Sequence, residues 1–292
     1  MLPELYAAQT SLVLPLDLPD PKRCPVTQLD SDCFLEVPLL LGGNPALNPE
    51  TSRQFSAGLV FEPVKGTSIG LDWWRLDLKH AITGLSSETV LDGNNRYEGK
   101  NIVRGPPDPA FPGLPGPIVA LVQINENIGR LTASGFDVDL RMRSGATPYG
   151  RFSADLVGTY LTEWRVAFDG VNEVSLVGTY QDQSYPRWQH TLTLGWERGP
   201  WAATLVQLWR AGTLDANPPD APRRHIASSQ VWDAQLAYTG IAELTLVLGV
   251  KNLLDRKPPT SNQISNFQVG YDPSAADPRG RSWYLRAGYR WR

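Results

Sequence analysis

The residue types that most often carry chemistry are few in this chain of 292 residues. There are three histidines, His80, His190 and His225, and two cysteines, Cys24 and Cys33. The histidines form no HxxxH or HExxH pair, and none lies near either cysteine, which argues against a metal site. The sequence also lacks a Gly-rich phosphate loop, a nucleophile elbow and paired carboxylates in a catalytic context. We therefore predict no enzyme activity, no metal and no cofactor.

Basic side chains form two small groups in segments rich in Pro, Gly, Asn and Asp. One is Arg223-Arg224-His225, and the other is Arg279 with Arg281. Guanidinium groups suit an anionic ligand such as a ferric chelate, because they donate several hydrogen bonds in a fixed geometry. The alternative is ordinary solvated loop charge, in contact with anionic lipid head groups. Both interpretations are open at this point.

Composition restricts the class of protein. The net charge is −3 and the pI is near 5.7, so the chain is neither basic enough to suggest nucleic acid nor acidic enough to suggest a disordered tail. No stretch approaches the roughly 18 uninterrupted apolar residues of a transmembrane helix. The N-terminus, Met1–Tyr6, lacks the basic and apolar regions of a signal peptide. These criteria would nevertheless not detect a membrane β-barrel, because the apolar residues of its strands alternate with polar ones.

Alternation with period two is the strongest signal in the sequence. Trp283, Leu285, Ala287, Tyr289 and Trp291 alternate with polar or small residues that include Arg286 and Arg290. Such a pattern places one face of a strand in an apolar medium and the other in a polar one. We predict about nine strands, at residues 51–62, 68–80, 118–142, 151–164, 189–197, 201–210, 230–239, 243–254 and 282–291. A short helix is possible around 85–91.

The connections between these strands alternate in length. Four are tight, at 63–67, 144–150, 198–200 and 240–242, and four are long, at about 81–117, 165–188, 211–229 and 255–281. Aromatic residues also gather near strand ends on the apolar phase, as Trp201 and Trp209 illustrate. Outer-membrane barrels have short turns on one side, long loops on the other, and aromatic girdles at both interfaces. For any single tryptophan, the alternative to a position in such a girdle is a position in the core of a soluble β-sandwich.

Five short motifs occur in order along nearly the whole chain. They are Leu2-Pro3-Glu4-Leu5-Tyr6, the segment 44–52 (NPALNPETS), Asn127-Ile128-Gly129 with 134–139 (SGFDVD), the segment 251–259 (KNLLDRKPP), and Tyr271-Asp272-Pro273 with 277–281 (DPRGR). Together they resemble the C-terminal part of the β-barrel of TonB-dependent outer-membrane receptors. The chain departs from the family pattern at its end, where Trp291 stands one place before the last residue.

The resemblance implies an all-β fold: an antiparallel transmembrane meander of about nine strands, from a barrel that has about 22 in the family. It implies an extracellular-loop segment at 1–49 and a partial barrel, open or curved, at 50–292. The implied function is TonB-dependent uptake of a scarce extracellular ligand such as a ferric siderophore, across the outer membrane. The plug, the TonB box and the upstream strands have no counterpart here, so we expect a truncated or split form. Its implied partners are outer-membrane lipid, those missing parts and TonB acting through the plug, with no nucleic acid.

An extracellular position for residues 1–49 also bears on Cys24 and Cys33. It implies a disulfide that closes a loop of about ten residues; the alternative is two free thiols in a cytosolic chain. Two other functions remain open: a small passive porin, which needs an even number of strands in a closed sheet, and a soluble β-sandwich that binds a ligand. Charged residues on the polar phase, such as Asp155 and Glu163, are expected to form ion pairs on the inner wall.

Overall fold

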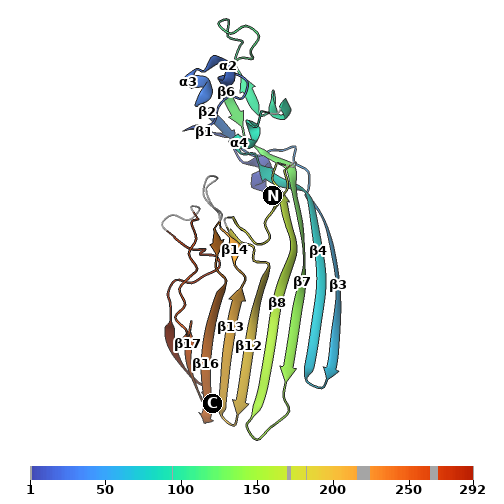
Figure 1. Ribbon diagram of the computed structural model, residues 1–292, viewed down its shortest axis with the longest axis vertical. Helices are drawn as coiled ribbons and strands as arrows, with labels where there is room; N and C mark the ends of the chain where they lie inside the picture. The colour runs from blue at the N-terminus through green and yellow to red at the C-terminus, as the bar shows by residue number, and fades with distance from the viewer. Residues whose placement is uncertain are drawn as a thin grey trace. The chain divides into compact units, whose positions relative to one another are not determined.

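A large antiparallel sheet dominates the computed structural model, which describes residues 2–93, 95–169, 172–181, 183–215, 224–263 and 269–291 (Figure 1). Its nine long strands are β3 (Thr51–Val64), β4 (Thr67–Gly84), β7 (Asn125–Arg143), β8 (Arg151–Ala167), β12 (Trp188–Arg198), β13 (Trp201–Arg210), β16 (Ser229–Ile241), β17 (Leu244–Lys251) and β18 (Ser282–Tyr289). They pair in chain order, from β3 to β18, and the short β9 (Val174–Ser175) pairs with β8. The path is open at β3 and β18, as expected for part of a barrel and unlike a closed porin.

The connections between the nine long strands confirm the predicted alternation in length. The tight ones are residues 65–66, 144–150, 199–200 and 242–243, and the long ones are 85–124, 168–187, 211–228 and 252–281. In an antiparallel meander, alternate connections lie at opposite ends of the strands, so the tight turns share one end. Gly66 is required in the first turn, because its φ is +82° and an added Cβ would lie 2.5 Å from the carbonyl oxygen of Arg143.

The strand register separates the side chains into an apolar and a polar face. One row across six neighbouring strands is apolar: Leu285, Leu248, Leu236, Ala203, Trp196 and Phe152. The adjacent row on the other phase is Tyr284, Gly249, Gln235, Thr204, Gly195 and Ser153. On the polar face, the Tyr284 hydroxyl donates to Gln235 at 3.0 Å. We call these two surfaces the apolar face and the polar face.

Ion pairs occur where the sequence predicts charged residues on the polar phase. Arg143 pairs with Asp155 at 2.9 Å, and Arg75 pairs with Glu163 at 3.0 Å. Each pair joins two different strands. The Arg143–Asp155 pair joins the neighbouring strands β7 and β8, and the Arg75–Glu163 pair spans from β4 to β8 across β7. Each pair stabilises the sheet by a modest amount because the side chains are partly exposed.

One predicted strand is wrong. Residues 118–142 form two strands, β6 (Ile118–Val122) and β7, and β6 belongs to a separate sheet with the order β1-β2-β6-β5. The other members of that sheet are β1 (Thr10–Pro15), β2 (Glu36–Leu41) and β5 (Ile102–Arg104). Residues 118–122 (IVALV) are continuously apolar, which suits a small buried sheet rather than a two-faced strand. The β2–β6 pair of this separate sheet is parallel, whereas the long strands of the large sheet form the predicted antiparallel meander.

The chain folds into two compact units. Unit 1 comprises Met1–Arg53, Asp77–Leu131 and Val166–Val174, and unit 2 comprises Gln54–Leu76, Thr132–Arg165 and Ser175–Arg292. Unit 1 has its own buried apolar cluster, which includes Leu35, Val90 and Leu121. Its helices are α1 (Leu2–Tyr6), α2 (Cys24–Thr27), α3 (Asp30–Cys33), α4 (Ser87–Val90) and the 3-10 turn η1 (Asn95–Tyr97). The helix expected around 85–91 is thus present as α4.

In their described parts, the long connections of unit 2 contain strands of two residues. These are β10 (Tyr180–Gln181) paired with β11 (Gln183–Ser184), and β14 (Thr213–Leu214) paired with β15 (His225–Ile226). Among the helices of the described residues, none is both long enough and apolar enough to cross a membrane.

Candidate functional site

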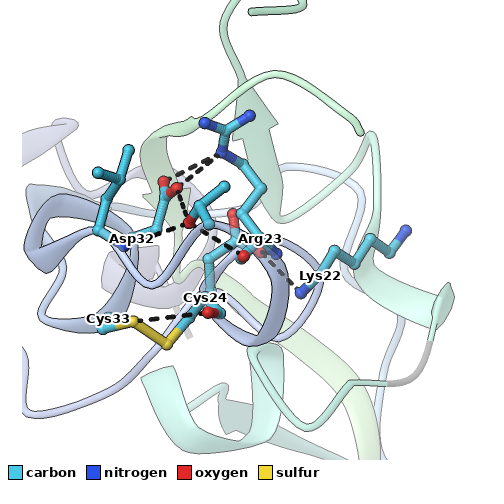
Figure 2. Close-up of a disulfide and its surroundings, with 8 residues drawn as sticks. Lys22, Arg23, Cys24, Asp32 and Cys33 are labelled. Carbon is cyan, nitrogen blue, oxygen red and sulfur yellow. Dashed lines mark hydrogen bonds and ion pairs between the residues drawn. A yellow bond between two sulfur atoms is a disulfide. The ribbon is translucent and has the colours of Figure 1, made fainter. Parts of the chain in front are cut away.

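The two cysteines are joined. Cys24 and Cys33 form a disulfide with their Cα atoms 4.9 Å apart, the pairing that an extracellular position implies (Figure 2). Cys24 begins α2 and Cys33 ends α3. The bond therefore connects two single-turn helices, which would be only marginally stable without such a constraint.

Of the arginines predicted to contact an anionic ligand, the described ones have partners within the protein. Arg224 donates to the side chains of Asn262 and Thr260, both at 2.6 Å. Arg279 pairs with Asp277 at 2.5 Å. The backbone N–H of Arg281 donates to Asp255 at 2.8 Å, and its guanidinium reaches the carbonyl oxygen of Leu253 at 3.4 Å. Arg223 lies outside the described residues.

These contacts hold Arg279 and Arg281 within the connection 252–281, and they hold Arg224 of the connection 211–228 against that same connection. The hydrogen bond from Arg279 lowers the pKa of Asp277 to about 2, so this exposed carboxylate is ionised throughout the physiological range. His225 lies in β15 and is exposed. Among the described residues, no hydrogen bond or ion pair directly joins the two predicted groups, and contact of these residues with a ligand stays a prediction.

A different set of cations lines a pocket on the polar face of unit 2. Arg210 and Lys251 come from the ends of β13 and β17, and Arg256 and Lys257 come from the connection that follows β17. Asp233 and Asp277 also line the pocket, so its charged side chains are four cations and two anions. We call this the basic pocket. Its position at the end of the strands with the long connections exposes it to ligands that approach from the loop side.

A buried asparagine organises the wall of the basic pocket. Asn252 is 7% exposed and has a φ of +49°, a conformation that Asn tolerates better than most residues. Its side chain accepts from the backbone N–H of Arg256 at 2.9 Å and donates to the carbonyl oxygen of Arg256 at 2.8 Å. Its own N–H donates to Asp233 at 2.8 Å. Asn252 therefore holds Arg256 beside the end of β17.

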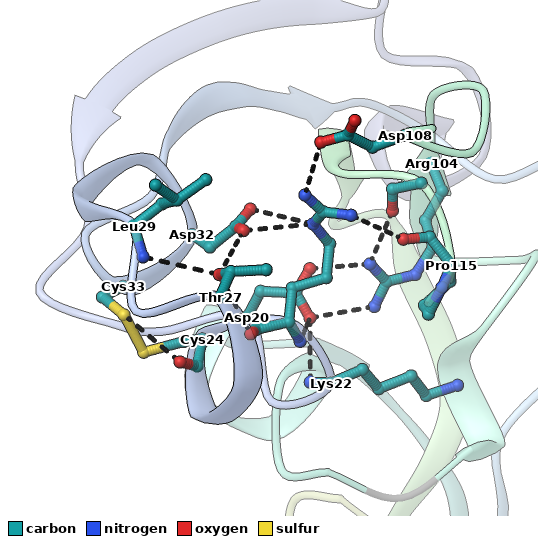
Figure 3. A network of polar contacts seen from close by, with 12 residues as sticks. Asp20, Lys22, Cys24, Thr27, Leu29, Asp32, Cys33, Arg104, Asp108 and Pro115 are labelled. Carbon is teal, nitrogen blue, oxygen red and sulfur yellow. Dashed lines mark hydrogen bonds and ion pairs between the residues drawn. A yellow bond between two sulfur atoms is a disulfide. The ribbon is translucent and has the colours of Figure 1, made fainter. Parts of the chain in front are cut away.

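Unit 1 contains a second polar constellation, centred on the buried Arg23 and the partly buried Arg104, that we call the arginine clamp (Figure 3). Arg23 is 2% exposed, and its Nε donates to both oxygens of Asp32, at 3.0 and 3.2 Å. Thr27 donates to the same carboxylate at 2.6 Å. A buried charge is tolerated only when it is paired and hydrogen-bonded, and here both charges are.

The second arginine of the clamp is Arg104, at the end of β5. It contacts Asp20 at 2.6 Å and Glu98 at 2.9 Å, and Lys22 also reaches Glu98, at 3.1 Å. Asp20 is fully buried. Segments more than 80 residues apart in the chain are therefore joined by charge-assisted hydrogen bonds.

The clamp changes the titration of its carboxylates. Burial alone would raise the pKa of Asp32, but the hydrogen bonds from Arg23 and Thr27 outweigh it and hold this pKa below its ordinary value. Hydrogen bonds from Arg104 and then Lys22 lower the pKa of Glu98, against a smaller effect of burial. Both groups are therefore anionic at neutral pH. Within the part of the chain that is described, no group of three or more His, Cys, Asp or Glu could hold a metal ion.

Comparison with known proteins identifies a family. The family model described as "TonB dependent receptor-like, beta-barrel" matches residues 36–253. Among curated proteins, none matches this chain.

Solved structures with the same fold include siderophore receptors, an iron transporter and a copper transporter. The siderophore receptor PirA from Acinetobacter baumannii has a TM-score of 0.58 at 19% identity, over 87% of this chain and 34% of that one. A mutant of the ferric enterobactin receptor PfeA from Pseudomonas aeruginosa has a TM-score of 0.56 at 19% identity, over 87% and 33%. The iron transporter FrpB from Neisseria meningitidis has a TM-score of 0.56 at 11% identity, over 86% and 32%. This chain spans about a third of the length of these structures, and at such identities the likeness concerns the fold alone.

Proposed function

The chain belongs to the TonB-dependent receptor-like β-barrel family, and we propose that it forms part of an outer-membrane barrel for the uptake of a scarce ligand such as a ferric siderophore. The family consists of receptors and transporters rather than enzymes. The single observation that best supports the proposal is the basic pocket on the polar face of a sheet whose opposite face is apolar.

The apolar face supports a position in a membrane. Near one end of β13, the ring of Trp201 contacts that of Tyr238 in a tilted arrangement, with centroids 4.5 Å apart. Near the other end, Trp209 stacks on His190, with centroids 5.6 Å apart. Eight residues separate the two tryptophans, which corresponds to about 26 Å along a strand and about 20 Å after a tilt near 40°. That height is close to the ~25 Å apolar band between the aromatic girdles of outer-membrane barrels. We propose that this face contacts lipid and that Arg286 and Arg290 point inward.

The basic pocket supports an anionic ligand. The pocket contains four cations and two carboxylates. Both carboxylates already accept hydrogen bonds: Asp233 accepts one from Asn252, and Asp277 accepts one from Arg279. Positive charge is therefore left to pair with a ligand, and ferric chelates with carboxylate or catecholate groups carry the matching charge. Names of structures with the same fold include receptors for siderophores and ferric enterobactin. For this chain, a ferric siderophore is accordingly the proposed class of ligand.

The open edges of the sheet favour the proposal that a partner supplies further strands. All fourteen residues of β3 are exposed, and in a membrane the unpaired N–H and C=O groups of an edge cost several kcal/mol each. Nine antiparallel strands leave β3 and β18 running in the same direction, so their direct pairing would create a parallel seam. A second copy in the same membrane orientation would meet this one in parallel as well. We propose that the edges pair with an odd number of strands from the remainder of a receptor, which also provides the plug that TonB engages.

The test of this function is uptake of iron. Deletion of the gene that encodes this chain should abolish growth on one or more ferric siderophores under iron limitation, and uptake of radioactive iron from those chelates should depend on TonB. Uptake that persists without TonB would indicate a passive pore. Residues 1–292 alone, behind an export signal, should not restore uptake, whereas co-expression with the remaining strands and plug should.

A further inference from the structure

The disulfide of unit 1 lies beside the arginine clamp in the chain. Arg23 directly precedes Cys24, and Asp32 directly precedes Cys33. The Cys24–Cys33 bond therefore holds the two members of the buried Arg23–Asp32 ion pair next to each other, as Figure 2 shows. Single-turn helices such as α2 and α3 cannot fix this geometry on their own.

Arg23 extends from this pair to a Pro-rich hairpin at residues 105–117. Its Nη1 donates to the carbonyl oxygen of Pro115 at 3.0 Å, its Nη2 contacts Asp108 at 3.5 Å, and its guanidinium lies 5.8 Å from the centre of the Phe111 ring. Figure 3 shows the contacts with Pro115 and Asp108. One buried side chain thus contacts three positions of the hairpin.

Arg104 holds the base of the same hairpin. It donates to the carbonyl oxygen of Gly116 at 3.0 Å, directly next to the carbonyl that Arg23 contacts. The base is closed by the N–H of Gly105, which donates to Pro117 at 2.8 Å. Gly116 must be glycine, because an added Cβ would lie 2.0 Å from the carbonyl oxygen of Gly105. The hairpin is therefore ordered by two arginines at consecutive carbonyls.

From this arrangement we propose that the Cys24–Cys33 disulfide is a local lock on the hairpin 105–117, acting through Arg23. A dithiol reductant would transfer two electrons and two protons to the cystine, which yields two thiols and leaves the reductant as a disulfide. The α2–α3 segment then gains conformational freedom, Arg23 loses its fixed position, and the hairpin is released while the large sheet stays folded. This inference is independent of the ligand and of TonB.

Hydrogen exchange with mass spectrometry tests the lock, since peptides from the hairpin and from the large sheet can be followed in one sample. In folded protein treated with a dithiol reductant, we expect exchange in residues 105–117 to become at least about tenfold faster, with residues 136–143 of β7 unchanged. Arg23→Met in the oxidised protein should give the same release although the disulfide is intact. Arg279→Met, which removes an exposed arginine of unit 2, is the matched control and should release nothing.

Two outcomes would overturn the proposal. Hairpin exchange that is unchanged after thiol titration has shown both cysteines reduced would mean that the disulfide does not lock the hairpin. Faster exchange in the hairpin and β7 together would mean that the disulfide supports the whole chain rather than the hairpin. Reduction is carried out on protein that has already folded. The test therefore does not need a variant without the disulfide, such as the double substitution Cys24→Ser and Cys33→Ser, which could fail to fold.

Discussion

Unit 1 and the sheet of unit 2 use the same amino acids in opposite ways. In unit 1, Val90 and Leu121 are fully buried in a cluster of apolar side chains. In unit 2, Leu285 is 75% exposed and Trp283 is 65% exposed, on a face that continues across neighbouring strands. Apolar patches of that extent are rare on soluble proteins and mark contact with another apolar phase. Unit 1 thus buries its apolar side chains, as proteins do in water, whereas the sheet exposes them, as the proposed contact with lipid requires.

Charged residues show the same contrast. Unit 1 buries Arg23 and Asp32 as a pair, next to a disulfide, whereas the ion pairs of the sheet are partly exposed on its polar face. All ten tryptophans belong to unit 2, so their fluorescence reports on the sheet, and unit 1 can be followed separately by hydrogen exchange. Unit 1 and the sheet of unit 2 can therefore be altered and their stabilities measured separately.

The largest effect is expected from Arg23→Met. This change leaves Asp32 as a buried charge without its partner, and loss of one member of a buried pair costs about 3–5 kcal/mol. Unit 1 should lose that much free energy of unfolding, measured by hydrogen exchange under native conditions, with little change in tryptophan fluorescence. A loss below about 1 kcal/mol would show that water replaces the guanidinium and that the pair is not truly buried.

A charge on the apolar face should have the next largest effect. Leu248→Arg places a cation within the apolar row, near the middle of β17, and should destabilise the sheet by about 2–4 kcal/mol in lipid vesicles. The measurement is tryptophan fluorescence during denaturant unfolding of the assembled barrel. Thr245→Arg, on the polar phase of the same strand, is the matched control and should cost far less. Equal effects of the two changes would contradict the assignment of the faces.

Changes in the basic pocket should act on ligand affinity rather than on stability. Arg256→Ala removes one of four cations, and the loss of a charge-assisted contact of about 1.5 kcal/mol corresponds to roughly a tenfold weaker affinity. Ferric enterobactin and a neutral ferric chelate, titrated against the assembled receptor, provide the measurement and its control. Arg198→Ala, which removes an exposed arginine at the tight-turn end of β12, is the control and should leave the affinity unchanged.

Acid should affect unit 1 modestly. Asp32 and Glu98 have a lower pKa in the folded chain than in the unfolded one, so they stabilise the folded unit at neutral pH. This stabilisation is lost as the pH falls from the unfolded pKa values through the lower folded ones. Protection of the peptide 105–117, corrected for the intrinsic rate of exchange, should therefore fall between pH 5 and pH 3 by about a few-fold or more. In Asp32→Asn protein this part of the pH dependence should be weaker.

The sequence alone determined the strands and their faces, because alternation is a local property. In a straight strand, alternate residues share one face whatever the register, as do Trp283, Leu285 and Ala287. A tight turn such as residues 199–200 places the two strands that it joins side by side, so they pair. The failure at 118–122 has a local reason too, since a run without alternation does not reveal which sheet will bury it.

Only the tertiary structure decided which charged residues meet. Arg23 and Arg104 have no sequence signature, and their partners Asp20, Glu98 and Asp108 are separated from them by between 6 and 85 residues. The motif at residues 251–259 contains three of the four cations of the basic pocket, Lys251, Arg256 and Lys257. They line one pocket with Arg210 only because β13 pairs with β16 and β16 pairs with β17. Alternation fixes the direction of a side chain from its own strand, whereas a site needs several strands and loops to place their side chains at one point.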